Sequence, residues 1–150
     1  MVGEHIVLVS DAGTPGVSDP GARLVARARE AGARIEAIPG PSALTAALSI
    51  AGLDASGFTF FGFLPHKKGR QTALKELASS TVPIVLYESP HRILKLLKEL
   101  ESLNVAGVTL ARELTKIHEE VISGAPAELL AHFSSHPSTV RGEFVVIVEP

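Results

Sequence analysis

Short apolar runs alternate along this chain with segments of helical periodicity, and that alternation is typical of an α/β fold. The first run, residues 5–9, is compact and apolar, as in a buried strand, and it ends at Ser10. A second run, residues 34–38, is predicted as the next strand of the same sheet. A sheet of only these two strands would have exposed edges and little core, so the first part of the fold looks incomplete.

A helix is predicted between these two strands, over residues 20–32. Asp19 stands where a capping side chain belongs, and Pro20 then occupies the first helical position. Gly32 is placed to end the helix.

The rest of the chain continues the alternation of strands and helices. The predicted strands cover residues 58–64, 83–87, 108–111, 119–123 and 144–148. The predicted helices cover residues 42–51, 71–79, 90–103 and 126–133. We expect the central strands to be buried, the last two to be antiparallel, and the sheet to be mixed.

The composition is that of a globular protein. Of the 150 residues, 45% are hydrophobic and 20% charged, which separates the chain from disordered sequences. Neither a transmembrane helix nor a signal peptide is predicted, so we expect a cytoplasmic protein without a membrane partner. Cysteine is absent, which excludes disulfides and thiolate metal sites. Because the net charge is −2, any contact with nucleic acid requires a local basic patch.

The segment SDAGTPGVSDPG, residues 10–21, follows the first predicted strand, where open α/β sheets bind ligands. Its glycines allow close approach to the backbone, and its carboxylates and hydroxyls offer polar contacts. It lacks the glycine spacing and the GK[ST] ending of phosphate-binding loops, and its acidic residues favour a cationic or hydroxyl-rich ligand. The alternative is that these residues only form turns.

The segment PGPSA, residues 39–43, also follows a predicted strand and opens a helix. The amide groups of that helix, with the Ser42 hydroxyl, can bind a carboxylate. The alternative is that Ser42 is a plain helix cap.

Two more polar segments follow strands further along. In YESPHR, residues 87–92, Glu88 and His91 are a candidate acid/base pair; the alternative is a helix capped by Ser89, with the next arginine in solvent. In ARELTK, residues 111–116, the Arg-Glu pair is ordinarily a surface ion pair worth little. Because four polar loops follow strand ends, a shared binding site is favoured over four unrelated turns and helix caps.

A basic loop follows the aromatic strand over residues 58–64. It contains Lys67, Lys68 and Arg70, close in sequence to Phe61 and Phe63, and such a combination suits single-stranded RNA. A solvated turn is the alternative. The six histidines show no metal-ligand spacing, so no metal is expected.

Taken in order, these motifs resemble the ribosomal-RNA cytidine 2′-O-methyltransferase branch of the tetrapyrrole methylase superfamily. The resemblance covers essentially the whole chain, and its specificity comes from five collinear motifs. They are SDAGTPGVSDPG at 10–21, PGPSA at 39–43, YESPHR at 87–92, ARELTK at 111–116 and RGEF at 141–144.

The resemblance implies a two-lobed α/β methyltransferase with S-adenosylmethionine as cofactor, folded between the lobes, and small-subunit ribosomal RNA as partner. The exposed edges of the incomplete first sheet also predict self-association, so a homodimer is expected. The cofactor contacts that it implies, motif by motif, are Asp11, Gly13, Thr14, Val17, Ser42, Ala43, Tyr87, Ala111 and Gly142. Lys67, Lys68 and Arg70 are the expected contacts to RNA phosphates.

Family members begin with a further strand and helices, which carry a Gly-Asn loop and an acidic Asp-Thr-Arg stretch. Neither motif is present here, so the chain looks N-terminally truncated. We expect residues 1–40 to be the remainder of the N-terminal methylase lobe, with parallel strands, and residues 41–150 to be a complete C-terminal lobe. Activity is therefore predicted for the parent family rather than for these 150 residues alone.

A ribose 2′-hydroxyl is a poor nucleophile and needs a base or a polarising partner. Glu88 and Glu113 are the candidates, and Glu88 is preferred. Two other functions remain open from the sequence: a methylase of tetrapyrrole precursors, against which the basic loop argues, and a non-catalytic remnant that dimerises.

Overall fold

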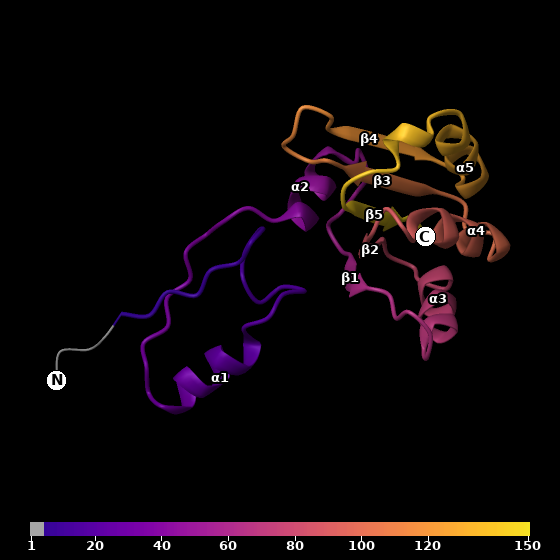
Figure 1. The fold of residues 1–150 in the computed structure, drawn as a ribbon. Coiled ribbons are helices and arrows are strands. Elements are labelled where there is room, and N and C mark those ends of the chain that lie inside the picture. The colour runs from indigo at the N-terminus through magenta and orange to yellow at the C-terminus, as the bar shows by residue number, and fades with distance from the viewer. Residues whose placement is uncertain (1–4) are drawn as a thin grey trace. The chain divides into compact units, whose positions relative to one another are not determined.

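The computed structural model describes residues 5–150. The chain divides into two compact units, Met1–Ser42 and Ala43–Pro150, and the predicted boundary after residue 40 lies two residues before this division. Figure 1 shows the first unit in indigo to violet and the second in magenta to yellow.

The first unit contains one helix, α1 (Ala22–Glu30), among its described residues. It begins two residues later than predicted, with Gly21 as its N-cap and without a side-chain cap, so the prediction of Asp19 as cap is wrong. It ends at Glu30, and Gly32 follows the C-cap residue Ala31, in the helix-ending position predicted for it. Two hydrogen bonds close the last turn around Gly32, one from the Gly32 N–H to the carbonyl of Arg29 and one from the Ala33 N–H to that of Ala28.

The two strands predicted in the first unit are not formed, and the parallel sheet expected there is therefore a wrong prediction. The side chains of Ile6 and Val9 are 82% and 77% exposed, and that of Ile38 is 82% exposed. No residue between 5 and 42 is buried. Two short apolar runs cannot shield each other from water, because a stable sheet needs at least a third strand or a covering helix.

The second unit is built on one five-stranded sheet with the strand order β1-β2-β5-β3-β4. The strands are β1 (Thr59–Phe63), β2 (Ile84–Glu88), β3 (Val108–Arg112), β4 (Glu120–Gly124) and β5 (Phe144–Val148). β1 and β2 are parallel, whereas β5 is antiparallel to both β2 and β3, and β4 is antiparallel to β3. The prediction of a mixed sheet is confirmed, and the last two strands, β4 and β5, are each antiparallel to β3.

Helices cover both faces of this sheet (Figure 1). On one face, apolar side chains of the strands form the larger core with α3 (Arg70–Ala78), α4 (Ile93–Ser102) and α5 (Pro126–Ser135). On the other face lies α2 (Ala43–Ile50), where Ala47 packs against Val85, Ala111 and Val145. A short 3-10 helix, η1 (Pro137–Thr139), precedes β5.

The alternation of side chains along the strands explains these two cores. Leu86 and Leu110 belong to the core of α3, α4 and α5, whereas their neighbours Val85 and Ala111 belong to the core of α2. Strands buried on both faces read as continuous apolar runs, and β5 is fully buried from Phe144 to Val148. None of the helices in the described residues combines the length and the apolar character that a bilayer crossing requires.

Candidate functional site

The topology of the second unit brings most of the predicted polar motifs to one edge of its sheet. β1, β2 and β3 run in the same direction and end at this edge, and β4 and β5 begin there. The register places Glu88, Phe144, Arg112 and Glu120 in one row across neighbouring strands. We call this row and the loops that leave it the strand-end edge.

Glu113 and Gly142 meet at the strand-end edge. Glu113 follows β3 directly, and Gly142 lies two residues before β5. A Cβ atom added to Gly142 would come within 2.6 Å of the Glu113 Cδ atom, so the glutamate side chain occupies the space that only a glycine leaves. Gly142 also has a φ of +71°, which disfavours any residue with a side chain. The sequence motifs that contain these two residues are therefore joined in space.

The carboxylate of Glu113 is held in its ionised form. The Nζ atom of Lys116 donates a hydrogen bond to Glu113 Oε1 at 2.8 Å. This hydrogen bond, and then the charges of Lys116, Arg112 and His118, lower the pKa of Glu113 below its usual value, while partial burial acts in the opposite direction. The side chain is 18% exposed, so a proton or a ligand can reach it.

The loop after β3 stores backbone strain. Glu113 has a φ of +50° and Thr115 a φ of +66°, values that side-chain-bearing residues adopt rarely. The Thr115 N–H donates to the Glu119 carboxylate at 2.5 Å, which closes the loop. Such strain is concentrated in proteins at functional positions.

Glu88 lies in a different environment from Glu113. It is completely buried, the Ser89 N–H donates to its Oε1 at 2.8 Å, and Arg92 Nε lies 3.3 Å from the same oxygen. Its Oε2 has no hydrogen-bond partner among the described residues. The alternative in which Arg92 is solvated is wrong, because its side chain is only 17% exposed and pairs with this carboxylate. His91 is exposed, and within the described residues neither a hydrogen bond nor an ion pair joins it to Glu88, so the two do not form the predicted acid/base pair.

Tyr87 and Ala111, the predicted cofactor contacts on the strands, lie on the face of the sheet that α2 covers. Glu88 is on the opposite face, because neighbouring side chains in a strand alternate. Ala111 is fully buried, whereas Tyr87 is partly buried and packs between Phe60 and Phe63.

The basic loop divides into exposed and buried cations. Lys67 and Lys68 are exposed, as expected of residues that bind phosphate. Arg70 is only 4% exposed: its Nε donates to both oxygens of Glu99 at 3.1 Å, and its Nη1 donates to the Pro65 carbonyl at 3.2 Å. The guanidinium is thus occupied inside the fold, and Arg70 shapes the loop rather than facing a ligand.

The remaining predicted cofactor contacts lie in or beside the first unit. The Thr14 hydroxyl donates to the Pro41 carbonyl at 3.2 Å, which joins the motif of residues 10–21 to PGPSA. Asp11, Gly13 and Val17 are exposed on the same loop. Ser42 ends the first unit and Ala43 begins α2.

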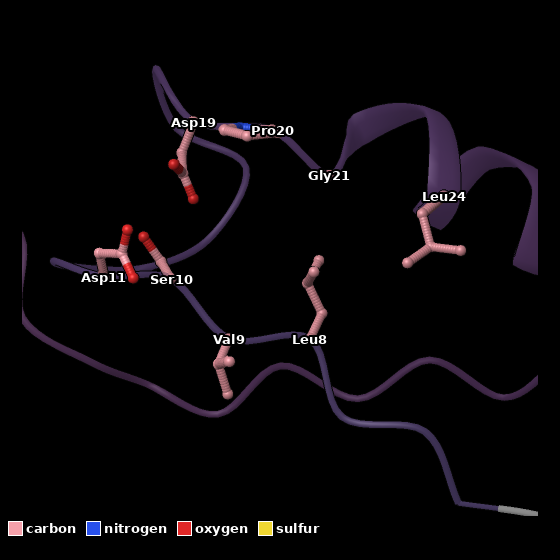
Figure 2. Close-up of a pocket in the computed structure, with 8 residues that line it drawn as sticks. All are labelled: Leu8, Val9, Ser10, Asp11, Asp19, Pro20, Gly21 and Leu24. Carbon is pink, nitrogen blue, oxygen red and sulfur yellow. The ribbon is translucent and has the colours of Figure 1, made fainter.

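A hollow of about 380 Å³ lies beside this loop. Figure 2 shows the residues that line it, among them the carboxylates of Asp11 and Asp19. Ser10 lies next to them, and Leu8 and Leu24 form its apolar side. A site lined by two carboxylates and a hydroxyl, with leucine side chains on its apolar side, suits a cationic ligand that carries hydroxyl groups. Within residues 5–150, no group of three or more His, Asp or Glu side chains is arranged to hold a metal ion.

Sequence reasoning missed one polar cluster on the strand-end edge. Arg112 was expected to pair with its neighbour Glu113 but instead pairs with Glu120 of β4, with Nε 2.6 Å from Oε2. His132 of α5 approaches the other oxygen of Glu120 at 3.7 Å. Only the register of β3 against β4 reveals the pair, because it places Arg112 opposite Glu120.

Comparison with known proteins identifies the family. The model of the Tetrapyrrole (Corrin/Porphyrin) Methylases matches residues 2–130. The chain belongs to the tetrapyrrole methylase family. The resemblance to the tetrapyrrole methylase superfamily is thereby confirmed, and the motifs at 10–21, 39–43, 87–92 and 111–116 all lie within the matched region.

Curated tetrapyrrole methylase relatives named Ribosomal RNA small subunit methyltransferase I are similar to nearly the whole chain. The protein from Xylella fastidiosa is 47% identical over 98% of this chain and 55% of its own length. The protein from Escherichia coli O157:H7 is 48% identical over 98% of this chain and 52% of its own length. The chain thus spans about half the length of these relatives.

Solved structures of other tetrapyrrole methylases share the fold. The cobalt precorrin-4 methyltransferase CbiF superposes with a TM-score of 0.68 at 17% identity, over 91% of this chain and 61% of that chain. A uroporphyrin-III C-methyl transferase from Thermus thermophilus, complexed with S-adenyl homocysteine, gives 0.58 at 20% identity, over 91% and 63%. The predicted tetrapyrrole methylase-like α/β fold is confirmed.

Proposed function

We propose that this protein is an S-adenosylmethionine-dependent methyltransferase that methylates a cytidine ribose 2′-hydroxyl of small-subunit ribosomal RNA. The observation that carries the proposal is the 47–48% identity, over nearly the whole chain, to relatives named Ribosomal RNA small subunit methyltransferase I. The strand-end edge supports it, because it joins a reachable carboxylate, Glu113, to a motif glycine, Gly142.

The residues present fit S-adenosylmethionine as the methyl donor. In the first unit, Asp11, Gly13, Thr14, Val17 and Ser42 are the proposed contacts, and exposed carboxylates there suit a cationic ligand. In the second unit the proposed contacts are Ala43, Tyr87, Ala111 and Gly142. When bound, the sulfonium supplies a methyl group that is already activated, so the protein mainly has to align it with the acceptor oxygen.

We assign the proton transfer to Glu113 rather than to Glu88. The complete burial of Glu88 and its pairing with Arg92 keep its carboxylate from meeting a ribose, which reverses the preference drawn from the sequence. Glu113 is reachable, because its side chain is 18% exposed at the strand-end edge. With the methyl donor bound, Glu113 would accept the proton that the ribose 2′-hydroxyl gives up when it is methylated.

Lys67 and Lys68 are the proposed contacts to RNA phosphates. Both are exposed on a loop whose backbone is held by arginines: Arg92 Nη2 donates to the Leu64 carbonyl at 2.8 Å, and Arg70 donates to the Pro65 carbonyl. A loop fixed in this way presents its lysines with little further loss of backbone conformational entropy on binding.

We also propose that the protein forms a homodimer. Apolar side chains of the first unit are largely exposed, among them Ile6, Val9 and Ile38. Surfaces of this kind favour self-association. Light scattering tests this: a dimer mass is expected, and a monomer at every concentration would contradict it.

Methyl transfer from labelled S-adenosylmethionine to two acceptors tests the function. The acceptors are small-subunit ribosomal RNA from cells lacking the enzyme, and uroporphyrinogen. We expect label in the RNA, and Glu113→Gln should reduce kcat by about 100-fold or more, as loss of a general base does, while Glu101→Gln on α4 serves as control. Label in uroporphyrinogen alone would establish a tetrapyrrole-precursor methylase instead. Calorimetry with S-adenosylmethionine distinguishes either enzyme from a non-catalytic remnant, which would not bind it.

A further inference from the structure

β1 contains an irregularity that changes which of its side chains share a face. Phe60 pairs with Val85 of β2 and Gly62 pairs with Leu86, so Phe61 is an extra residue between two successive pairs. Gly62 has a φ of +64°, the left-handed conformation that this kind of bulge favours in a glycine. Bulges are rare in parallel pairs, so the position is a built feature of the strand.

The consequence of the bulge is an aromatic cluster. In a regular strand Phe60 and Phe63 would point to opposite faces. With the extra residue, both rings contact Tyr87 of β2, at centroid distances of 5.1 Å for Phe60 and 5.6 Å for Phe63. Phe61 turns instead to the core of α3, α4 and α5. We call Phe60, Tyr87 and Phe63 the aromatic shelf.

The outer member of the aromatic shelf faces solvent. Phe63 is 48% exposed although its ring is fixed against Tyr87, whereas Leu64, the next residue, is 2% exposed in the core. A half-exposed ring in a defined orientation can stack against a flat ligand without a large entropic cost. If Phe63 only had to shield the sheet from water, the bulge at Phe61 and the glycine at position 62 would not be needed to bring its ring beside Tyr87.

Cations follow Phe63 at short range along the chain. Lys67 and Lys68 are exposed four and five residues later, and the intervening Leu64 and Pro65 carbonyls are fixed by Arg92 and Arg70. The Phe63 ring and the two ammonium groups therefore belong to one segment, residues 63–68, whose backbone is fixed by hydrogen bonds from these two arginines. An aromatic surface beside cations is the combination that binds single-stranded nucleic acid, which carries a flat base and a phosphate on every nucleotide.

We propose that Phe63 stacks on an unpaired nucleobase of the RNA substrate, while Lys67 and Lys68 bind phosphates of the same strand. The inference rests on the proposed function and adds to it a base contact that is separate from the methyl donor. An apolar peptide would leave the lysines unused, and a free polyphosphate would leave the ring unused. A single-stranded segment of RNA uses both.

The test compares three variants of the protein, Phe63→Leu, Phe63→Trp and Phe58→Leu. Phe58 is the matched control, since it is 38% exposed and lies just before the other end of β1. The probe is a fluorescein-labelled single-stranded fragment of small-subunit ribosomal RNA, and S-adenosylmethionine binding is measured separately by calorimetry. Phe63→Leu should raise the Kd for RNA by about 5- to 100-fold, the value expected for loss of one base–aromatic stack. Phe63→Trp should restore the affinity, and Phe58→Leu should change it less than about twofold.

Three other outcomes would each overturn the inference. An unchanged RNA Kd in Phe63→Leu, with methyl transfer to RNA by the unaltered protein intact, removes the stacking role and leaves the proposed function standing. A parallel loss of S-adenosylmethionine affinity assigns Phe63 to the methyl donor instead. Failure of the unaltered protein to bind or methylate RNA overturns the proposed function and this inference together.

Discussion

The carboxylate of Glu113 lies directly against the α-carbon of Gly142, although the two residues are separated by the whole of β4, α5 and η1. The contact is possible because β3 and β5 are neighbours and Arg112 is in register with Phe144. It places the proposed base beside a proposed cofactor contact, and both sides of the contact can be changed by mutation.

Gly142→Ala should lower the free energy of unfolding by about 1–2 kcal/mol, because alanine disfavours a φ of +71° and its Cβ displaces the Glu113 side chain. Urea denaturation measures the loss. The double variant Glu113→Ala/Gly142→Ala should lose less than the sum of the single changes, since the collision disappears. Gly57→Ala, where a Cβ meets nothing within 4 Å, is the control. Strict additivity would show that the contact has no energetic effect.

Lys116→Met should raise the pKa of Glu113 toward its ordinary value, because the strongest influence lowering it is the hydrogen bond from Lys116. Since the folded-state pKa is the lower one, the stabilisation by the pair is present above the unfolded pKa and is lost as pH falls through the folded value. An NMR titration of the Glu113 carboxyl carbon reports the change. Lys98→Met on α4 should leave that titration unchanged, and an unchanged titration in Lys116→Met would refute the assignment.

Glu88→Gln should destabilise the protein by about 1–3 kcal/mol, because it removes the charge that pairs with Arg92 inside the fold. Turnover at saturating substrate should fall little in the variant at temperatures where it stays folded. Chemical denaturation and kcat are measured on the same preparation, with the exposed Glu101→Gln as reference. A loss of kcat by a factor of 100 or more at unchanged stability would return the role of base to Glu88.

Arg70→Ala should cost about 3–5 kcal/mol of unfolding free energy, since it leaves the carboxylate of Glu99 without its partner. Arg70→Lys should recover only part of this, because an ammonium group cannot reproduce the forked contact. Thermal denaturation of both variants measures the effect. If Arg70→Ala were as stable as the unaltered protein and only lost RNA affinity, the arginine would be a phosphate contact as first expected.

Lys67→Ala and Lys68→Ala should each reduce the slope of log Kd for RNA against log salt concentration by about 0.7, the value for one phosphate contact on a single strand. Stability should not change, because both side chains are exposed. Lys75→Ala on α3 provides a matched surface lysine. An unchanged slope in both variants would remove the basic loop from the RNA interface.

The strands and helices of the second unit could be predicted from sequence because their apolar side chains are buried against one another within this unit. β5 agrees with its predicted bounds, and α5 begins at the predicted Pro126. The strands expected at residues 5–9 and 34–38 failed for the opposite reason. Their apolar pattern describes strands that a larger sheet would bury, and within the described residues no such sheet surrounds them.

The site was predictable in part for the same physical reason. Motifs at the carboxyl ends of parallel strands converge on one edge, which the sequence order already implied. What the sequence could not show was the face on which each side chain lies. The burial of Glu88 with Arg92 and the pairing of Arg112 with Glu120 depend on how the strands pair, which leaves no signal in the sequence. The position of Phe63 beside Tyr87 depends on a bulge, for which Gly62 within the predicted strand was the available signal.

The nature of the methylated nucleoside tests the central claim most directly. Small-subunit ribosomal RNA from cells lacking the enzyme is incubated with the protein and methyl-labelled S-adenosylmethionine, digested to nucleosides and separated by mass spectrometry. Label in 2′-O-methylcytidine, lost in Glu113→Gln, is the predicted result. Label on a base rather than on a ribose, or an RNA that stays unlabelled, would contradict it.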